Sequence, residues 1–168
     1  IKHKKELFSG EAKMLQYAEP KRIDSAGTFY NALGWAYARG KDQDASQYEK
    51  IGETFASCGG AAIYRRDLLE EIGLFDEKYF AYLEDIDIGY RARIFGYQNY
   101  YEPKAKVIHA GSATSGSRYN EFKTKLSSAN NAYMIGKNMP LLQLLCNLPF
   151  LFVGFLVKAA FFFIKKMG

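Results

Sequence analysis

The sequence predicts an α/β domain over residues 1–140, followed by a hydrophobic helical segment over residues 141–168. Two observations support this prediction. Short runs of strand-type residues alternate with helical patterns through the first 140 residues, which is typical of α/β proteins. In residues 141–164, 19 of the 24 side chains are apolar, so this segment differs in kind from the domain before it.

The composition is that of a folded protein with a mildly basic surface. The 168 residues are 48% hydrophobic and 24% charged, and the formal net charge is +5. Such an excess suits an anionic partner, for example a phosphate ligand or a lipid surface. Lysine-rich stretches such as residues 1–8 are usually solvated surface, and we expect no nucleic-acid partner.

The two cysteines, Cys58 and Cys146, lie far apart and show no metal-binding spacing. We therefore expect no disulfide and a reducing compartment. The charged N-terminal residues are not followed by the apolar core of a secretory signal. The sequence does not begin with Met, and we expect the chain to be part of a longer protein.

The first third of the chain carries weak secondary-structure signals. Residues 1–22 are charged with a weak helical pattern, and we expect a helix there. Residues 23–40 indicate loop and short strand, and residues 41–50 a polar surface loop. Residues 54–66 predict a strand interrupted at residues 59–60, where two glycines allow a close backbone approach or a bulge.

Stronger signals follow. Asp67 and Glu70 form a start like a capping box for a helix that Gly73 ends. A second helix is expected from residue 84 to about residue 95. The remaining elements, in chain order, are a connecting loop over 73–80, strands over 97–103 and 105–109, a small-residue loop over 110–117, and a helix over 119–138.

Three acids open the second helix. Asp87 falls on its apolar face, where we expect a partly buried pair with Arg91, whereas Asp85 points to the opposite side and can face a cleft. Acids are common in a first helical turn because they complement the helix dipole, so a purely structural role also fits Glu84, Asp85 and Asp87. An Asp at this position is expected to stay ionised.

His109 is a second candidate. It ends an expected strand and leads into a glycine- and serine-rich loop, a usual position for a site residue in an α/β fold. A lone histidine is also commonly structural.

Residues 58–97, followed by the segment AKVIHAGSAT, resemble the C-terminal half of family 2 glycosyltransferases with a GT-A (Rossmann-like) fold, specifically the bacterial rhamnosyltransferase-like enzymes. The resemblance covers about residues 20–140. It rests on four elements that occur in the family's order: Gly59 and Gly60 before a helix, a GLFDE turn, Glu84 and Asp85 opening the next helix, and His109 after a strand.

The resemblance implies an inverting sugar transfer from a nucleotide-diphosphate sugar to a glycan or lipid-linked acceptor in cell-surface polysaccharide synthesis. Asp85 matches the general base, and Glu84 would orient the acceptor or the base. His109 matches a ligand to the divalent metal, Mg or Mn. The expected substrate-binding residues are Cys58, Gly59, Gly60 and Asp87.

The family's Asp-x-Asp metal motif follows an apolar strand in its first half. Asp42 and Asp44 have the spelling but lie in a polar loop, and Asp85 and Asp87 lie within a helix. We therefore expect residues 1–140 to form a partial GT-A domain, with the metal-binding acids and the donor-nucleotide half upstream. On this expectation the chain alone neither binds a nucleotide sugar well nor transfers it.

The hydrophobic segment favours association with the cytoplasmic face of a membrane, because an aromatic cluster followed by two lysines ends it. Pro149 argues against one straight helix, and Lys158 is costly in hydrocarbon. Whether the segment crosses the bilayer or lies in one leaflet stays open, and a buried core helix is an alternative.

Two other functions are consistent with parts of the sequence. One is a non-catalytic, membrane-anchored module in which the acids are structural. The other is a metal-dependent phosphohydrolase, which would need more metal ligands than His109 and the acid cluster provide.

Overall fold

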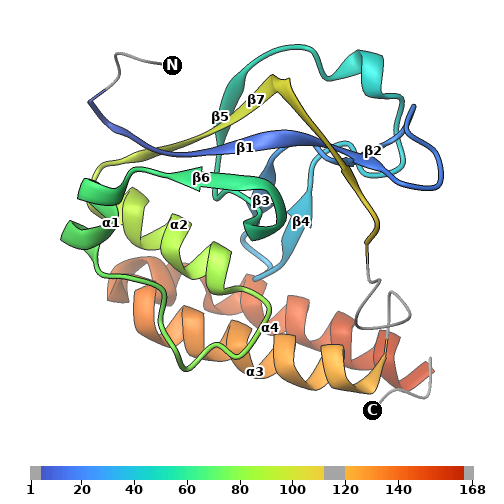
Figure 1. The fold of residues 1–168 in the computed structure, drawn as a ribbon. Coiled ribbons are helices and arrows are strands. Elements are labelled where there is room, and N and C mark those ends of the chain that lie inside the picture. Colours follow the sequence, from blue (N-terminus) through green and yellow to red (C-terminus); the bar gives the residue numbers. More distant parts are fainter. Residues whose placement is uncertain (1–4, 112–119, 165–168) are drawn as a thin grey trace.

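A computed structural model describes residues 5–111 and 120–164. It confirms a mixed α/β fold with a curved sheet and four helices in this part of the chain, and all four helices lie on one side of the sheet (Figure 1). The strands are β1 (Leu7–Gln16), β2 (Ile23–Ser25), β3 (Thr28–Tyr30), β4 (Ala36–Ala38), β5 (Gly52–Thr54), β6 (Ala62–Tyr64) and β7 (Gln98–His109). The α-helices are α1 (Arg66–Ile72), α2 (Glu84–Ile94), α3 (Glu121–Asn138) and α4 (Leu141–Ile164), and two 3-10 turns are η1 (Ala45–Gln47) and η2 (Gly59–Ala61).

The five-stranded sheet is built around β1. On one side β1 pairs in parallel with β7, and β5 continues the sheet from there; on the other side it pairs antiparallel with β6 and then with β2. Strands β3 and β4 form a separate hairpin. Because β2 and the end of β7 both pair with the C-terminal part of β1, they lie near each other.

The helix expected over residues 1–22 is wrong, because residues 7–16 form the central strand β1. Its polar side chains Ser9, Glu11 and Lys13 are all buried, so the strand lacks the simple alternation that marks a half-exposed strand. Their partners come from distant segments, and no local pattern announces them. Ser9 bonds Ser57 and Asn99, for instance, at 2.8 and 2.6 Å.

The two strands expected over 97–103 and 105–109 are one strand, β7, with an irregularity at residues 103–105. Ala12 pairs with Glu102, yet the next residue, Lys13, pairs with Lys106. Pro103 lies in this bulged stretch, where its lack of an N–H removes no ladder hydrogen bond.

The helices expected after Asp67, from residue 84 and over residues 119–138 are present. Helix α1 begins at Arg66 with Arg65 at its N-cap and no side-chain cap hydrogen bond, so the capping box expected from Asp67 and Glu70 is wrong. Helix α2 packs closely enough that a Cβ on Gly89 would lie 2.4 Å from the Cβ of Ala56, so only glycine fits there. Ile86 and Tyr90 of α2 lie in one core cluster with Met134 of α3, while Ile88 and Ala92 face a second cluster with Phe8 of β1. The small-residue loop expected over 110–117 lies mostly outside the described residues.

Helix α4 runs without interruption through Pro149, contrary to the expected break. It is not a buried core helix, because Gly154 is its only buried residue within the described part of the chain. By length and apolar composition it could cross a membrane. Nevertheless it lies against α3 and the β3–β4 hairpin (Figure 1). The Trp35 indole donates to the Gly154 carbonyl at 3.3 Å.

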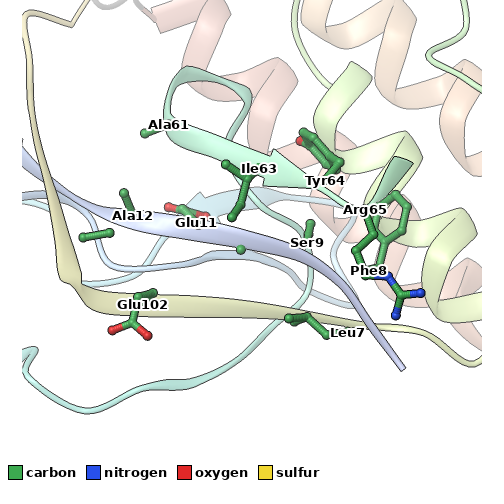
Figure 2. Close-up of a pocket in the computed structure, with 12 residues that line it drawn as sticks. Leu7, Phe8, Ser9, Glu11, Ala12, Ala61, Ile63, Tyr64, Arg65 and Glu102 are labelled. Atoms are coloured by element: carbon green, nitrogen blue, oxygen red, sulfur yellow. The ribbon is translucent and has the colours of Figure 1, made fainter. Parts of the chain in front are cut away.

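A largely apolar pocket of about 310 Å³ lies over β1 between residues of β6 and β7 (Figure 2). Gly10 leaves room there, and the side chain of Ile63 covers it: a Cβ on Gly10 would lie 3.7 Å from Ile63 Cγ1. The acids and the histidine singled out by the sequence are elsewhere, so this pocket is not the candidate site.

Candidate functional site

A second, larger cleft of about 700 Å³ contains most of the candidate residues. It lies between the ends of β2 and β7, the η2 turn, the β3–β4 hairpin and the start of α2. Its described lining is Asp24, Ser25, Thr28, Ala36, Tyr37, Ala38, Lys41, Cys58, Gly59, Gly60, Tyr82, Leu83, Glu84, Asp85, Ile86, His109 and Ser127. Six of the seven residues selected from the sequence therefore share one cavity, and Asp87 is the exception.

Asp85 is positioned by the start of α2 and by η2. Its Oδ2 accepts the Gly59 backbone N–H at 3.0 Å, and its Oδ1 accepts the N–H of Ile86 at 2.8 Å. Burial raises the pKa of Asp85, and this effect outweighs the backbone hydrogen bonds that favour ionisation. From the sequence we expect the helix dipole to keep Asp85 ionised. Instead, its carboxyl group holds its proton more tightly than an ordinary aspartate does.

Glu84 faces the same cleft with one oxygen uncommitted. Burial, together with the charge of Asp85, raises the pKa of Glu84. Its Oε2 is buried and has no hydrogen-bond partner within the described residues. A buried acceptor without a partner is costly, and it is well suited to receive a donor such as a hydroxyl group.

Gly59 and Gly60 lie between the carboxylate and the imidazole. A Cβ built on Gly59 would lie 3.9 Å from Asp85 Oδ2, and one built on Gly60 would lie 3.8 Å from His109 Nε2. The absence of side chains keeps the floor of the cleft open between Asp85 and His109.

Cys58 precedes the glycines and is held from behind. Its N–H donates to Glu11 Oε2 at 2.9 Å. Burial, reinforced by the negative charge of Asp85, raises the pKa of the Cys58 thiol to about 12, so the thiol is not a thiolate nucleophile at neutral pH.

His109 is oriented by Asp24. The imidazole Nδ1 lies 2.7 Å from Asp24 Oδ2, while Nε2 is the nitrogen nearest Gly60. Burial acts to raise the pKa of Asp24, but hydrogen bonds from Lys41 and His109 outweigh it and hold that pKa below its usual value. An ionised carboxylate behind a histidine fixes the ring and leaves the other nitrogen available to a ligand.

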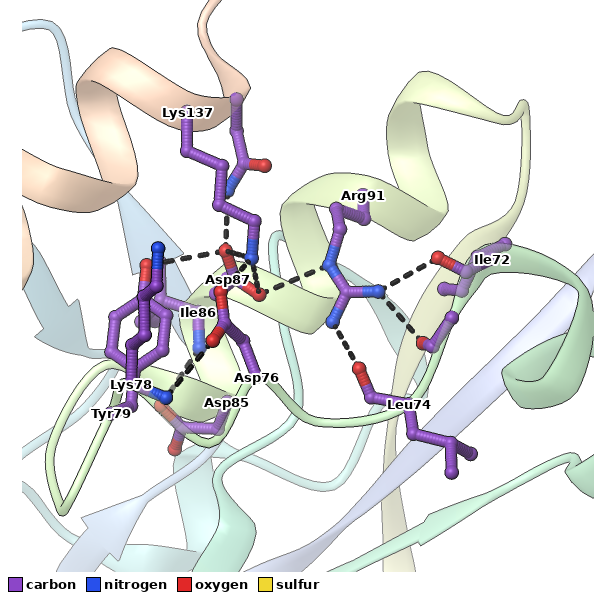
Figure 3. Close-up of polar contacts among 12 residues, drawn as sticks. Ile72, Leu74, Asp76, Lys78, Tyr79, Asp85, Ile86, Asp87, Arg91 and Lys137 are labelled. Atoms are coloured by element: carbon purple, nitrogen blue, oxygen red, sulfur yellow. Dashed lines mark hydrogen bonds and ion pairs between the residues drawn. The ribbon is translucent and has the colours of Figure 1, made fainter.

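Asp87, expected among the substrate-binding residues, does not reach the cleft. It is fully buried and accepts from Arg91 Nε at 3.0 Å and from Asn138 Nδ2 at 2.7 Å (Figure 3). Lys137 and Tyr79 complete its partners, at 3.0 and 3.2 Å. The expected buried pair with Arg91 is therefore confirmed, within a larger network.

Arg91 connects this network to the end of α1 and the turn that follows it. Its guanidinium donates to the carbonyls of Ile72, Gly73 and Leu74 at 2.8, 2.7 and 2.8 Å (Figure 3). Asp87 thus helps to hold α1, α2 and α3 together beneath the cleft, without a side-chain contact to the cavity.

The turn that leads into α2 is strained. Tyr82 and Leu83 both adopt left-handed backbone conformations, with φ of 70° and 69°, which costs roughly 1–2 kcal/mol for each non-glycine residue. Asn130 of α3 donates to the carbonyls of Ala81 and Tyr82 at 2.8 Å each. These bonds hold the strained turn in the conformation that directs Glu84 and Asp85 into the cleft.

The donor set does not by itself form a metal site. No group of three or more His, Cys, Asp or Glu side chains within residues 5–111 and 120–164 is arranged to hold an ion. His109 Nε2 is one suitable donor atom, and any further ligands must come from a substrate or from other residues.

Three residues of the site escaped the sequence reasoning. Glu11 was hidden by the wrong helix, Asp24 stands alone in a short strand, and Asn130 is an ordinary helical polar residue. Each of the three bonds a residue that is distant in the sequence. Glu11 and Cys58 are 47 positions apart, Asp24 and His109 are 85 apart, and Asn130 and Tyr82 are 48 apart. The one available signal for Glu11 was an acid set among small and apolar residues in the run FSGEAKM, residues 8–14.

No family model matches the sequence. Two curated relatives, the N-acetylglucosaminyl-diphospho-decaprenol L-rhamnosyltransferases of two Mycobacterium tuberculosis strains, are each 31% identical to the chain over 90 residues. The match covers 54% of this chain and 28% of the length of each relative. This similarity relates the chain broadly to glycosyltransferases.

Proposed function

We propose that the chain is the acceptor and catalytic part of an inverting family 2 glycosyltransferase with a GT-A fold. It transfers a sugar from a nucleotide-diphosphate donor to a glycan or lipid-linked acceptor in cell-surface polysaccharide synthesis. The observation that carries this proposal is the shared cleft: Glu84 and Asp85 lie on one side of Gly59 and Gly60, and His109 on the other. The relatives, whose acceptor is named as a diphospho-lipid, support the same class of reaction.

In this proposal Asp85 is the general base. The acceptor hydroxyl oxygen forms a bond to the anomeric carbon while the bond to the donor diphosphate breaks, and the hydroxyl proton passes to the Asp85 carboxylate. A pKa raised by burial makes Asp85 a stronger base than an exposed aspartate. Positioned base catalysis of this kind contributes about 10²–10⁴-fold in rate.

Glu84 orients the acceptor. Its unpartnered Oε2 accepts a hydrogen bond from an acceptor hydroxyl, which places the reacting oxygen near Asp85. The flanking glycines leave the space that the sugar or diphosphate occupies.

His109 faces the diphosphate end of the cleft, with Asp24 fixing its ring. The Mg or Mn ion of the family would supply charge neutralisation for the leaving diphosphate, with His109 Nε2 as a ligand. Further ligands and most donor contacts would come from residues outside this chain, consistent with a match over only 28% of each relative.

Helix α4 anchors the protein to a membrane, at the cytoplasmic face where nucleotide sugars and lipid-linked acceptors meet. Its apolar length supports membrane association. A second candidate function is not favoured by any observed feature, and a phosphohydrolase lacks a cluster of metal ligands in the described residues.

The test uses membranes that contain the natural-length protein, supplied with radiolabelled nucleotide-diphosphate sugars and a polyprenyl-diphosphate-linked saccharide. Transfer of label to the lipid, with release of the nucleoside diphosphate, supports the proposal. Hydrolysis of phosphate esters without transfer identifies a phosphohydrolase, and the absence of both reactions with every donor identifies a non-catalytic module.

A further inference from the structure

Helix α4 contacts the domain along one narrow stripe that runs almost its whole length. The residues of α4 that are not exposed recur every three or four positions, and all face the domain: Leu144, Asn147, Leu151, Gly154, Lys158 and Phe162. A Cβ on Gly154 would lie 2.1 Å from the carbonyl oxygen of Leu33, so the helix backbone touches the β3–β4 hairpin directly. The helix therefore lies on the domain surface, and its closest backbone approach is to the hairpin.

The outward face of α4 is broad and apolar. Thirteen large hydrophobic side chains of this helix are exposed: Leu141, Leu142, Leu145, Leu148, Phe150, Phe152, Val153, Phe155, Leu156, Val157, Phe161, Phe163 and Ile164. If α4 crossed a bilayer in this arrangement, the polar helix α3 beside it would enter the hydrocarbon as well. A helix attached along its length to a polar domain lies in the plane of the membrane, with only its outer face in lipid.

A pocket of about 300 Å³ lies between α3, α4 and the hairpin, next to this outer face. Trp35, Leu151, Phe155 and Phe162 provide much of its apolar lining, and Asn131 adds a polar group. It contains one charge, the ammonium of Lys158, which lies 5.8 Å from the centre of the Trp35 ring. No carboxylate pairs with Lys158 among the residues that the structure describes, although a cation in apolar surroundings favours an anionic partner.

Sequence neighbours line this pocket and the candidate catalytic cleft. Ser128 lines the pocket, and its neighbour Ser127 lines the cleft; Trp35 lines the pocket, and the next residue, Ala36, lines the cleft. A molecule that is anionic at its head and apolar along its tail fits these features: its tail would rest on α4, its phosphate would lie at Lys158, and a sugar beyond the phosphate would point towards the side that Ser127 and Ala36 line.

We propose that the pocket between α3 and α4 binds the phosphate end of the lipid-linked acceptor, with Lys158 as its counter-charge and the outer face of α4 in the same leaflet. The identity of that lipid as an acceptor rests on the proposed function. Binding itself does not require catalysis, so the two are tested separately.

The experiment measures binding of the purified chain, added from outside, to preformed vesicles by co-sedimentation. The vesicles contain phosphatidylcholine alone, phosphatidylcholine with a polyprenyl diphosphate, or phosphatidylcholine with phosphatidylglycerol at equal total charge. We expect binding to all three through α4, with the polyprenyl diphosphate vesicles preferred. Lys158→Met, which keeps an apolar stem, should lose about tenfold in affinity for these vesicles alone, whereas Lys158→Arg should keep the preference.

Lys125→Met is the matched control, because it removes an equal charge from an exposed position on α3 that pairs with Glu121. It should change binding to both anionic vesicles slightly and equally. Equal binding of Lys158→Met and the unmodified chain to polyprenyl diphosphate vesicles would overturn the proposal. So would equal preference for phosphatidylglycerol, or no binding to any vesicle. Loss of sugar transfer with lipid binding intact would refute the proposed function and leave the lipid site standing.

Discussion

Asn130 donates an amide hydrogen to the carbonyl of Tyr82 across 2.8 Å and so ties the middle of α3 to the strained turn before α2. The neighbouring carbonyl of Ala81 receives the second amide hydrogen. Two left-handed residues in succession are held by a side chain whose own position is fixed by packing. The acids of the cleft are therefore aimed by a helix that supplies only one residue, Ser127, to the lining of the cavity.

This relationship predicts that Asn130→Ala lowers both stability and turnover. Two partly buried carbonyls lose their partner, which should reduce the free energy of unfolding by about 1–3 kcal/mol. In a Tyr82→Gly background the same change should cost less, because glycine adopts the left-handed conformation without strain. Chemical denaturation of the four variants measures this coupling.

Asn99→Ala is the control for Asn130. Its side-chain amide likewise donates to two backbone carbonyls, those of Phe55 and Gly89 at 2.7 and 3.2 Å, and Asn99 lines neither the cleft nor the pocket between α3 and α4. It should lose similar stability but leave turnover per folded molecule unchanged. If both variants reduced kcat equally, Asn130 would be a structural residue with no special relation to the acids.

The raised pKa of Asp85 predicts a stability cost at neutral pH. The folded protein holds this proton to a higher pH than the unfolded chain, so stability is fully present below the unfolded pKa and is lost as pH rises through the folded pKa. Asp85→Asn should melt at a higher temperature than the unmodified chain at pH 7, and the difference should vanish in acid. Circular dichroism melts across this range provide the measurement.

The pKa of Asp67 is shifted in the opposite direction from that of Asp85. A hydrogen bond from Arg65 lowers the pKa of this exposed carboxyl, so its stabilising effect is present at neutral pH and is lost in acid. Asp67→Asn should therefore never be more stable than the unmodified chain at pH 7. A stabilised Asp67→Asn together with an unchanged Asp85→Asn would contradict the assigned role of burial at Asp85.

Lys41 should control the ionisation of Asp24 behind His109. Because the Lys41 hydrogen bond is the largest effect that lowers the pKa of Asp24, Lys41→Met should raise that pKa. The stability contributed by ionised Asp24 would then be lost at a higher pH as the solution is acidified. Carboxyl carbon NMR of Asp24 follows the titration directly, and an unchanged titration midpoint would show that His109 alone stabilises the carboxylate.

Asp87 pairs with Arg91, and Glu70 pairs with Arg66. Both pairs are four residues apart on a helix, but the first is buried and the second is exposed. Asp87→Ala leaves Arg91 and Lys137 without their shared buried partner and should cost about 3–5 kcal/mol of stability. Glu70→Ala breaks an exposed pair with Arg66 and should cost about 0.5 kcal/mol or less. Denaturation midpoints of the two variants compare them, and equal losses would rule out the buried network as a major source of stability.

Gly154 should determine whether α4 stays on the domain. Gly154→Leu places side-chain atoms where the Leu33 carbonyl lies, so α4 should detach from the hairpin. Trp35 is the only tryptophan, and its indole bonds the Gly154 carbonyl, so its fluorescence reports the separation. Gly136→Leu, where a Cβ meets no atom within 4 Å, should leave the emission unchanged.

Local signals predicted α1, α2, α3 and α4, but they also predicted a helix over residues 1–22, where the structure has β1. The acids at the start of α2 and the glycine after α1 mark helix ends through contacts within one or two turns, and the structure has α1 and α2 within about two residues of those marks. The burial of Asp87 with Arg91 also followed from helical spacing. The apolar run of α4 was evident from composition alone.

The sheet could not be predicted in the same way. Strand β1 is central because β7, some 90 residues later, pairs with it. The polar residues of β1 are buried, but in the sequence alone they resemble the charged face of a helix. Asp24 joins His109 for the same reason: β2 and β7 flank β1, and this adjacency is a property of the topology. The candidate acids were therefore recognisable, whereas the residues that orient them were not.

Single-turnover kinetics of Asp85→Asn in the full-length protein tests whether Asp85 accepts the proton of the acceptor hydroxyl in the shared cleft. We expect a transfer step slower by about 10²–10⁴-fold, with acceptor binding retained and a melting temperature equal to or above that of the unmodified protein. Transfer at an unchanged rate by a folded Asp85→Asn variant would contradict this role of Asp85.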